Sequence, residues 1–398
     1  MSKHISNRIL NLSESQTLAM AAKGRELRAQ GIDIISLSLG EPDFDTPDFI
    51  KEAAFDAIRN NYTHYPPVTG YLDVREAIAR KFKRDNNLDY GPENIIISTG
   101  AKQSLMNVVL SLVNPGEEIL LPAPYWVSYH AMAEVAEAKP VIIPTTIENN
   151  FKITPEQLRA HLTENTRLMI FSSPCNPSGS VYTKEELEAL AEVAAEKEDF
   201  YIISDEIYEH INFSGKHASI GTIEKIKDRV ITVNGVAKGF AMTGWRLGYI
   251  GAPEWIVKAA AKIQGQFTSG ANTIAQMAAK AAVEADPEVT KEMQATFLKR
   301  RGIIIDALSK IEGVQLNVPQ GAFYIFPNIS SFFGKKYKDY HIQNASDLSM
   351  YILDEARVAT VTGDAFGNPE CIRLSYATSD DIIIEAAQRI KTALDKLQ

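Results

Sequence analysis

Lys238 and Arg246 lie in the part of this sequence whose composition most favours chemistry. Lys238 follows a β-branched run at residues 230–233, and four glycines lie from residue 235 to residue 248. Because glycine adopts tight turns without steric cost, the backbone here can approach a ligand closely. Arg246 adds a planar group of donors suited to a phosphate. Such a pair is what a covalently bound, phosphorylated aldehyde requires, and pyridoxal phosphate is the usual cofactor of that kind. A lysine taken alone is more often a solvated surface residue, but this apolar, glycine-rich setting favours the chemical role.

Asp205 is a second candidate for the same site. It follows residues 200–204, which are mostly apolar and predict a strand of a buried parallel sheet. Such a strand brings the residue at its carboxyl end to the edge where open α/β folds bind ligands. A buried carboxylate is costly unless it is paired, and a protonated pyridine nitrogen would stabilise it. The alternative is that Asp205 caps the helix that follows.

The segment from residue 94 to residue 113 predicts a phosphate site. A strand at 94–98 opens directly into a helix at 101–113. The free amide hydrogens of a helix N-terminus attract phosphate, so we assign the backbone of Gly100, Ala101 and Lys102 to this role. Without Lys238 and Arg246 elsewhere in the sequence, a helix N-terminus facing water would be the simpler interpretation.

Residues 237–249 (Ala-Lys-Gly-Phe-Ala-Met-Thr-Gly-Trp-Arg-Leu-Gly-Tyr) resemble the cofactor-lysine signature of class I aminotransferases. The resemblance extends from about Ile9 to the C-terminus and is strongest to the bacterial aspartate aminotransferase subgroup. It implies that Lys238 carries pyridoxal 5'-phosphate as a covalent aldimine and that Arg246 holds the cofactor phosphate. Ala237 departs from the pattern, because many relatives have a serine here that also touches the phosphate. We expect this to weaken cofactor retention, not to abolish it.

The resemblance implies further cofactor contacts. Trp126 would stack on the pyridine ring, unless it is a core tryptophan. Asn176 and Tyr208 would contact the O3' oxygen, and Pro177 is expected to follow a cis peptide bond. Tyr65 would reach the partner's cofactor phosphate, which implies a homodimer with two shared active sites. The predicted catalytic residues are Lys238, Asp205 and Tyr208, and the predicted cofactor-binding residues are Lys238, Gly100, Ala101, Lys102, Trp126, Asn176, Asp205, Tyr208, Arg246 and Tyr65.

The substrate contacts are likewise implied by the resemblance. The backbone at Gly40 would meet the α-carboxylate, although an ordinary Gly-Glu-Pro turn would account for the same sequence. Arg373 would grip that carboxylate with two hydrogen bonds, whereas a lone strand arginine is usually a surface charge. Residues 265–276 lack the arginine that reads the distal carboxylate in eukaryotic-type and enterobacterial enzymes. In the subgroup that this chain resembles, a lysine at the Gly-Ala-Lys position takes over this role, which implies Lys102. The lesser candidates for it are Ser15 and Thr17, and the predicted substrate-binding set is Gly40, Lys102, Trp126, Asn176 and Arg373.

The elements that must position these residues predict an α/β protein of fold type I. The expected large cofactor-binding domain, residues 46–290, has a mostly parallel seven-stranded sheet in an α/β/α sandwich. Residues 1–45 would form an N-terminal arm and part of the small domain, and residues 291–398 a small α+β domain. The charged, aromatic stretch 332–345 is expected to be a solvated loop. Helices are expected at 13–30, 47–60, 71–86, 101–113, 183–197 and 288–310. Further strands are expected at 34–39, 167–172, 313–326, 356–360 and 370–378, together with a strand from residue 118 that ends in the aromatic pair at 125–126.

The composition limits the partners. A chain of 398 residues with 45% apolar content can bury a full core. Its net charge of −9 disfavours nucleic acid and anionic membranes as general partners. We expect no membrane span and no signal peptide. Two cysteines are too few for a disulfide framework, so a cytoplasmic location is expected. The seven histidines have no ligand-like spacing, so we predict no metal site, and the motifs of zinc proteases, P-loop proteins, Rossmann folds and serine hydrolases are absent from the sequence.

The expected function is aspartate aminotransferase, a transaminase that passes an amino group from L-aspartate to 2-oxoglutarate. Prephenate, aromatic or broad-specificity transamination remains an alternative, because related subgroup enzymes with this lysine differ in substrate. A lyase or decarboxylase of the same fold would use the same cofactor residues. A transcription regulator built on this fold would need a DNA-binding module and a basic surface. The chain starts about ten residues before the catalytic domain's own arm and is acidic, which disfavours that interpretation.

Overall fold

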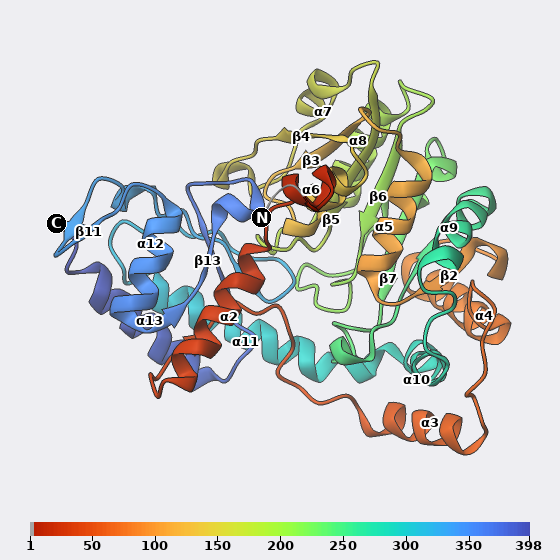
Figure 1. Cartoon of the computed structure of the whole chain (residues 1–398), viewed down its shortest axis with the longest axis horizontal. Coiled ribbons are helices and arrows are strands. Elements are labelled where there is room, and N and C mark those ends of the chain that lie inside the picture. The colour runs from red at the N-terminus through yellow and green to blue at the C-terminus, as the bar shows by residue number, and fades with distance from the viewer. Residues whose placement is uncertain (1–3) are drawn as a thin grey trace.

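Seven strands form the central sheet of the larger part of the molecule (Figure 1). The structure is a computed structural model, and it describes residues 4–398. Strand β8 is antiparallel to its neighbours β2 and β7, and the other strands all run in one direction. The predicted, mostly parallel α/β sheet is therefore confirmed. In order across the sheet the strands are β2 (Ile95–Ser98), β8 (Gly248–Gly251), β7 (Val230–Gly235), β6 (Tyr201–Asp205), β5 (Thr166–Ser172), β3 (Glu118–Pro122) and β4 (Lys139–Ile143).

Alternate side chains of the strands pack against helices on opposite faces of this sheet. Ile119 and Leu121 belong to a buried cluster that includes α5, α6 and α9, whereas Leu120 belongs to a cluster with α8. This alternation follows from the two-residue period of a strand. A third cluster joins β2 to α3, α4 and α10. The helices of this part are α3 (Asp48–Arg59), α4 (Leu72–Lys81), α5 (Ala101–Leu112), α6 (Val127–Val135), α7 (Pro155–His161), α8 (Lys184–Ala194), α9 (Glu254–Phe267) and α10 (Thr273–Glu284).

The carboxyl ends of the parallel strands meet at one edge of the sheet. Strands β2, β5, β6 and β7 end at Ser98, Ser172, Asp205 and Gly235, and each is followed by a turn or a helix start. In α/β sheets this edge is where ligands bind. The predicted site residues at 173–179, 205–208 and 236–246 thus follow three adjacent strands, and those at 99–102 follow β2, which β8 separates from β7.

The smaller part packs around the long helix α11 (Figure 1). Strand β14 (Ile372–Ser375) lies between β13 (Val361–Thr362) and β9 (Tyr324–Ile325) and is antiparallel to both. Strand β1 (Ile35–Ser36) pairs in parallel with β12 (Val358–Ala359), so an N-terminal segment joins the C-terminal part. The division at about residues 45 and 290 stays a prediction, and residues 1–3 of the proposed arm lie outside the described residues. The helices here are α2 (Gln16–Ala29), α11 (Lys291–Leu308), α12 (Ala345–Tyr351) and α13 (Asp380–Leu394).

The expectation of a solvated loop at 332–345 is wrong. Strands β10 (Lys336–Tyr337) and β11 (Tyr340–His341) form an antiparallel hairpin. Phe332 and Ile342 at its ends are buried, and the Tyr340 ring packs edge-on against Tyr351. These aromatic and aliphatic side chains attach the segment to the core despite its charges. The strand expected at 34–39 is shorter, and the helix expected at 71–86 ends in a π-helical turn at Phe82–Asn86.

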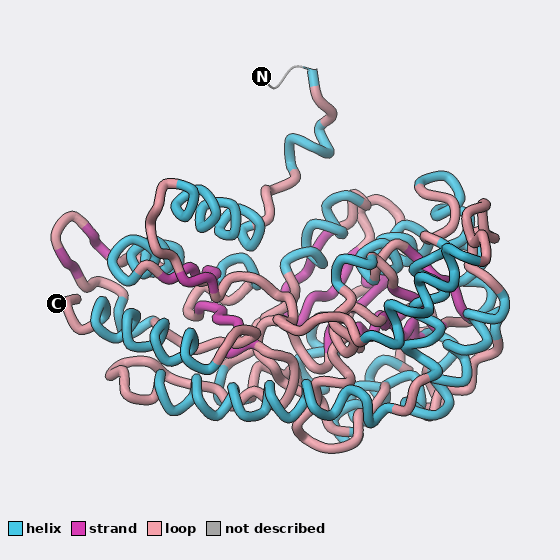
Figure 2. The backbone as a smooth tube through the Cα atoms, turned by 90° about the horizontal axis from the view of Figure 1, so that it is seen from below, coloured by secondary structure: helices cyan, strands magenta, loops and turns pink. Residues whose placement is uncertain are grey.

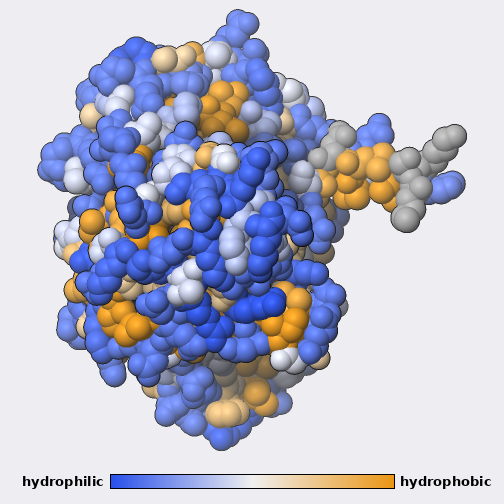
Figure 3. Space-filling view, turned by 90° about the vertical axis from the view of Figure 1, so that its left-hand side faces the viewer, coloured by the Kyte–Doolittle hydropathy of each residue, from blue (hydrophilic) through white to orange (hydrophobic). Residues whose placement is uncertain are grey.

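The N-terminal segment stands away from the body of the molecule (Figure 2). It contains the short helix α1 (Asn7–Asn11). Apolar side chains gather on this projection (Figure 3), and Ile5, Ile9 and Leu10 are all exposed. Across residues 4–398, every helix is too short or too polar to cross a bilayer.

Candidate active site

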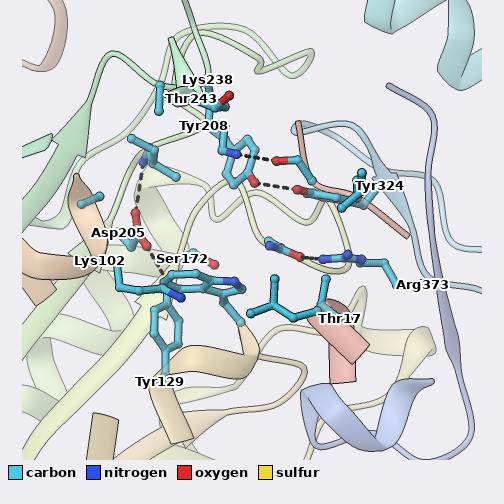
Figure 4. Close-up of a pocket in the computed structure, with 18 of the residues that line it drawn as sticks. Thr17, Lys102, Tyr129, Ser172, Asp205, Tyr208, Lys238, Thr243, Tyr324 and Arg373 are labelled. Carbon is cyan, nitrogen blue, oxygen red and sulfur yellow. Dashed lines mark hydrogen bonds between the residues drawn. The ribbon is translucent and has the colours of Figure 1, made fainter. Parts of the chain in front are cut away.

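A pocket of about 280 Å³ opens at the carboxyl edge of the sheet and brings most of the predicted site residues together (Figure 4). Gly100 and Tyr65 do not line it: Gly100 lies directly behind it at the start of α5, and Tyr65 is 96% exposed on the surface. Thr17 reaches the pocket, whereas Ser15 lines a separate hollow. The predicted residues that line the pocket are Gly40, Ala101, Lys102, Trp126, Asn176, Asp205, Tyr208, Lys238, Arg246 and Arg373.

Lys238 lies in the turn that follows β7, and its ammonium points into the pocket (Figure 4). Its Nζ donates to the carbonyl oxygen of Gly40 at 2.5 Å. Burial lowers the pKa of Lys238 to about 8; Glu41 opposes this shift, and the positive charges of Arg373 and Arg246 add to it. At pH 7 about a tenth of the amine is therefore uncharged, far more than for an ordinary lysine, as a nucleophile or general base requires.

Asp205 is the last residue of β6 and is 4% exposed. Its Oδ2 accepts a hydrogen bond from the Tyr129 hydroxyl at 2.7 Å, and its Oδ1 accepts one from the Ile207 amide at 3.3 Å. Burial raises the pKa of Asp205 to about 6, although the Tyr129 hydrogen bond opposes the shift. The Ile207 contact shows that Asp205 also caps the local turn. A cationic ring nitrogen in the pocket would stabilise the carboxylate more strongly than this turn does.

The N-terminus of α5 and Arg246 form a positively charged end of the pocket. Gly100 has a φ of +81°, and a Cβ on it would lie 2.4 Å from Nη2 of Arg246. Only glycine therefore lets the guanidinium approach the helix start. Lys102 lies on the first turn of α5 with its Nζ 4.9 Å from the Trp126 ring, and burial, assisted by Arg246, lowers its pKa. Trp126 is only partly buried and lines the pocket, so it is not a core tryptophan.

Arg373 enters the pocket from β14 and is 2% exposed. Its Nη1 donates to Oδ1 of Asn176 at 2.8 Å and its Nη2 donates to the Ser38 carbonyl at 2.6 Å. Among residues 4–398 its buried Nε has no hydrogen-bond partner. Burial lowers the pKa of Arg373, while the Tyr324 and Tyr208 hydroxyls oppose this. A buried guanidinium with an unused donor is suited to an anionic ligand.

Tyr208 and Asn176 complete the set of predicted residues. The Tyr208 hydroxyl lies 2.7 Å from that of Tyr324, and burial raises the pKa of Tyr208 well above its ordinary value. Asn176 follows β5, and the peptide bond before Pro177 is cis, as predicted. Both side chains can therefore donate to an oxygen in the pocket.

Several pocket residues carry no clear signal in the sequence. Tyr129 is the exception, because it lies one helical turn after Trp126 and therefore faces the same side of α6. Tyr324 and Ser172 are ordinary strand residues, and only the sheet register places them in the pocket. Thr243 and Leu39 reach the pocket through loop conformation alone.

The pocket fits pyridoxal phosphate on three independent grounds. Lys238 supplies an amine whose pKa is lowered, and Asp205 supplies a buried acceptor for a ring nitrogen. The α5 N-terminus and Arg246 supply a phosphate site. In this part of the chain the hydrogen bonds of Lys238, Arg246 and Arg373 go to carbonyl and amide oxygens and not to carboxylates. Their charges are thus available to an anionic cofactor and substrate.

Comparison with known proteins assigns the family. The family model described as aminotransferase class I and II matches residues 32–390. The bifunctional aspartate aminotransferase and glutamate/aspartate-prephenate aminotransferase of Petunia hybrida is 46% identical, covering 98% of this chain and 82% of that protein. The aspartate/prephenate aminotransferase of Nitrosomonas europaea is 44% identical, covering 98% and 99% respectively. The crystal structure of the aspartate aminotransferase from Rhizobium meliloti superposes with a TM-score of 0.96 at 37% identity, covering 99% of this chain and 100% of that one. With these matches along nearly its whole length, the chain belongs to the class I and II aminotransferases and is a pyridoxal-phosphate-dependent transaminase.

Proposed function

We propose that this enzyme transfers the amino group of L-aspartate to 2-oxoglutarate, giving oxaloacetate and L-glutamate in a two-stage cycle. The observation that carries the proposal is that Arg373 and Lys102 enter the pocket from opposite sides (Figure 4). Two cations placed in this way suit a substrate with two carboxylates. The names of relatives at 46% and 44% identity, which include aspartate as a substrate, support the same choice.

The proposal gives each side chain a specific task. Pyridoxal phosphate, bonded to Lys238, supplies an electron sink for the charge that develops at Cα of the substrate. Asp205 holds the proton of the ring nitrogen, and Tyr208 donates to the ring oxygen. The Lys238 amine would act as the general base that removes the Cα proton of the substrate. With a pKa of about 8 this amine is basic enough to accept the proton, and about a tenth of it is uncharged at pH 7, a fraction that rises as the pH approaches 8.

Substrate orientation depends on Arg373. Its guanidinium is fixed by Asn176 and the Ser38 carbonyl. These bonds use two of its five N–H donors, so the unpartnered Nε and the second N–H of each Nη remain for the α-carboxylate. The Lys102 ammonium lies 4.9 Å from the Trp126 ring, at the end of a long, unbranched side chain. A flexible point charge can meet distal carboxylates at different positions.

Prephenate transamination is the second candidate, because both relatives named above include prephenate in their names. Prephenate also has two carboxylates, but they are arranged differently from those of oxaloacetate. The flexible side chain of a lysine is compatible with both. Aromatic specificity and a lyase activity of the same fold have no such supporting observation in the pocket.

The test is a half-reaction screen with the purified enzyme. Aspartate, glutamate and aromatic amino acids are added to the cofactor-loaded enzyme, and prephenate, 2-oxoglutarate and oxaloacetate to its amine form. We expect aspartate to discharge the visible absorbance of the bound cofactor and to yield oxaloacetate. Release of pyruvate or carbon dioxide without a stable amine form would instead indicate a lyase or decarboxylase.

Lys238→Ala tests the covalent bond. This variant is expected to bind the cofactor without the lysine-dependent absorbance and to lose turnover. Lys258→Ala, at an exposed lysine on α9, is the matched control and should behave as wild type. Full turnover by Lys238→Ala would refute the assignment.

We also propose that the enzyme acts as a cytoplasmic homodimer. Tyr65 is 96% exposed and outside its own pocket, which suits a residue that serves the partner subunit. The apolar side chains of Ile5, Ile9 and Leu10 on the projecting arm are suited to burial against a second copy. Both cysteines, Cys175 and Cys371, are free and buried, as a reducing compartment would allow. Sedimentation of the loaded enzyme tests the dimer, and a monomer with undiminished cofactor affinity would refute it.

A further inference from the structure

The turn that carries Asp205 and Tyr208 has a second, fully buried polar face. After Asp205 the chain passes through Glu206 and then a turn at residues 207–210. Asp205 and Tyr208 line the pocket, whereas the carboxylates of Glu206 and Glu209 point away from it, and their side chains are 1% and 4% exposed. Two buried carboxylates within four residues demand compensation from the surrounding chain.

The Glu206 carboxylate is fully hydrogen-bonded. Its Oε1 accepts from the hydroxyls of Ser219 at 2.6 Å and Ser204 at 3.0 Å. Its Oε2 lies 2.9 Å from Nε2 of His217 and accepts from the Asn86 amide at 3.3 Å. Its backbone amide donates to the Val233 carbonyl on β7 at 2.9 Å. Glu206 is therefore fixed from every side.

The Glu209 carboxylate is held by α4 and the turn that follows it. It forms an ion pair with Lys81, the last residue of α4, whose side chain is 2% exposed. Its Oε2 accepts from the Asn86 amide at 2.5 Å, and Lys81 Nζ donates to Oδ1 of Asn86 at 2.7 Å. Burial alone would raise the pKa of Glu209, but Lys81 together with His210 and His217 lowers it to about 2. The carboxylate is thus charged at all working pH values.

This group resembles a metal site only in its spacing. Ligand atoms of Glu206, Glu209 and His217 lie within 4.8 Å of one another. The Lys81 ammonium already neutralises Glu209, however, and the Asn86 amide bridges the two carboxylates. A buried ion pair with its hydrogen bonds satisfied fixes geometry more than it adds stability.

We propose that the buried network of Lys81, Asn86, Glu206 and Glu209 positions the Asp205–Tyr208 turn against the cofactor. None of these four side chains lines the pocket, so they are positioning residues and not catalytic ones. Tyr208 lies directly before Glu209 and one residue after Ile207, so loss of the anchor would let its hydroxyl move away from the ring oxygen. Weaker donation to that oxygen raises the proton affinity of the Lys238 nitrogen in its bond to the cofactor. The inference rests on the proposed Lys238 bond.

The test is the double substitution Lys81→Met with Glu209→Gln, which removes both charges and nearly preserves the side-chain volumes. The matched control is Lys152→Met with Glu186→Gln, an ion pair remote from the pocket in the described structure, with side chains 12% and 40% exposed. The measurements are pH titration of the bound cofactor's visible absorbance, the cofactor dissociation constant and thermal unfolding. We expect the first variant to raise the spectroscopic pKa by about half a pH unit or more and to weaken cofactor binding about three- to tenfold, the effect of one hydrogen bond. The control variant should change neither the spectroscopic pKa nor the cofactor dissociation constant.

An unchanged spectroscopic pKa and dissociation constant in Lys81→Met with Glu209→Gln would overturn the inference, whatever happens to its thermal stability. If that variant does not fold, Ser219→Ala removes a single donor to Glu206 and should move the spectroscopic pKa in the same direction by a smaller amount. An unchanged spectroscopic pKa in Ser219→Ala would then overturn the inference. A wild-type enzyme that lacks the Lys238-dependent absorbance would refute the proposed function instead, so the two failures are distinguishable.

Discussion

Replacing Asp205 by asparagine should make the cofactor-free enzyme more stable, because burial disfavours the charge that the Asp205 carboxylate carries at neutral pH. Burial raises the pKa of Asp205 from 3.8 to about 6. The folded protein therefore binds this proton more tightly than the unfolded chain does. The resulting stability is fully present below pH 3.8 and is lost as the pH rises through about 6. Above that pH the ionised carboxylate disfavours the folded state.

The two pKa values give the size of this effect. At 1.36 kcal/mol for each tenfold change, the penalty is about 1.6 kcal/mol at pH 5 and about 3 kcal/mol at pH 7. Asp205→Asn removes the charge and keeps an oxygen that can accept from Tyr129. Any constant effect of the new amide cancels when two pH values are compared. The stability of the variant relative to wild type should thus increase by about 1.3 kcal/mol between pH 5 and pH 7.

The measurement is guanidinium unfolding of both cofactor-free proteins at the two pH values. Glu118→Gln is the matched control, since Glu118 is also buried but hydrogen bonds from Thr163 and Lys139 lower its pKa. The control should be less stable than wild type by a nearly constant amount over this range. If the difference in unfolding free energy between Asp205→Asn and wild type is equally independent of pH, burial does not disfavour the charged Asp205 carboxylate in the cofactor-free enzyme, and the reasoning fails.

The other predictions concern the remaining pocket residues. Arg373→Lys should raise the KM for aspartate about 10- to 100-fold with a smaller change in kcat, because one ammonium cannot replace the fixed fork; an unchanged KM in steady-state assays would contradict this. Lys102→Met should reduce kcat/KM for aspartate about tenfold while leaving monocarboxylic amino acids little affected, and an equal loss on both classes would contradict it. Tyr208→Phe should raise the spectroscopic pKa of the bound cofactor by about one pH unit, which a pH titration of its absorbance checks. Cofactor uptake by the empty enzyme should accelerate with pH and level off above about 8, where Lys238 is mostly uncharged; a rate independent of pH in stopped-flow measurements would show that this amine does not limit the reaction.

The sequence predicted the parts of the site that depend on local chemistry. Lys238 was recognisable because its glycine-rich turn is written in consecutive residues, and Asp205 because an apolar strand leads directly into it. Gly100 was recognisable from the strand and helix on either side of it. The structure adds the reason for that glycine, since Arg246 occupies the space where a Cβ would lie. For these three residues, the fold class and the periodicity of a single helix or strand were sufficient for the prediction.

Contacts between distant segments could not be predicted in this way. The Arg373 guanidinium is held by Asn176, 197 residues away, and by the Ser38 carbonyl, 335 residues away. The Lys81 and Glu209 ion pair joins residues that are 128 positions apart. Short strands such as β1 and the β10–β11 hairpin depend on tertiary pairing and not on local propensity. The aromatic side chains that bury the hairpin gave no local indication of their partners.

The pocket places several ionisable groups in unfavourable environments at once. Asp205 has a raised pKa, and burial lowers the pKa values of Lys238, Lys102 and Arg373. Each of these pKa shifts means that the protein environment disfavours the charged form of the group. A ligand with a cationic ring nitrogen and an anionic phosphate would offset this cost at Asp205 and at the α5 end of the pocket, because it brings opposite charges to those groups. Cofactor binding and protein stability should therefore be strongly coupled, and the residues that bind most tightly are those that destabilise the protein without the cofactor.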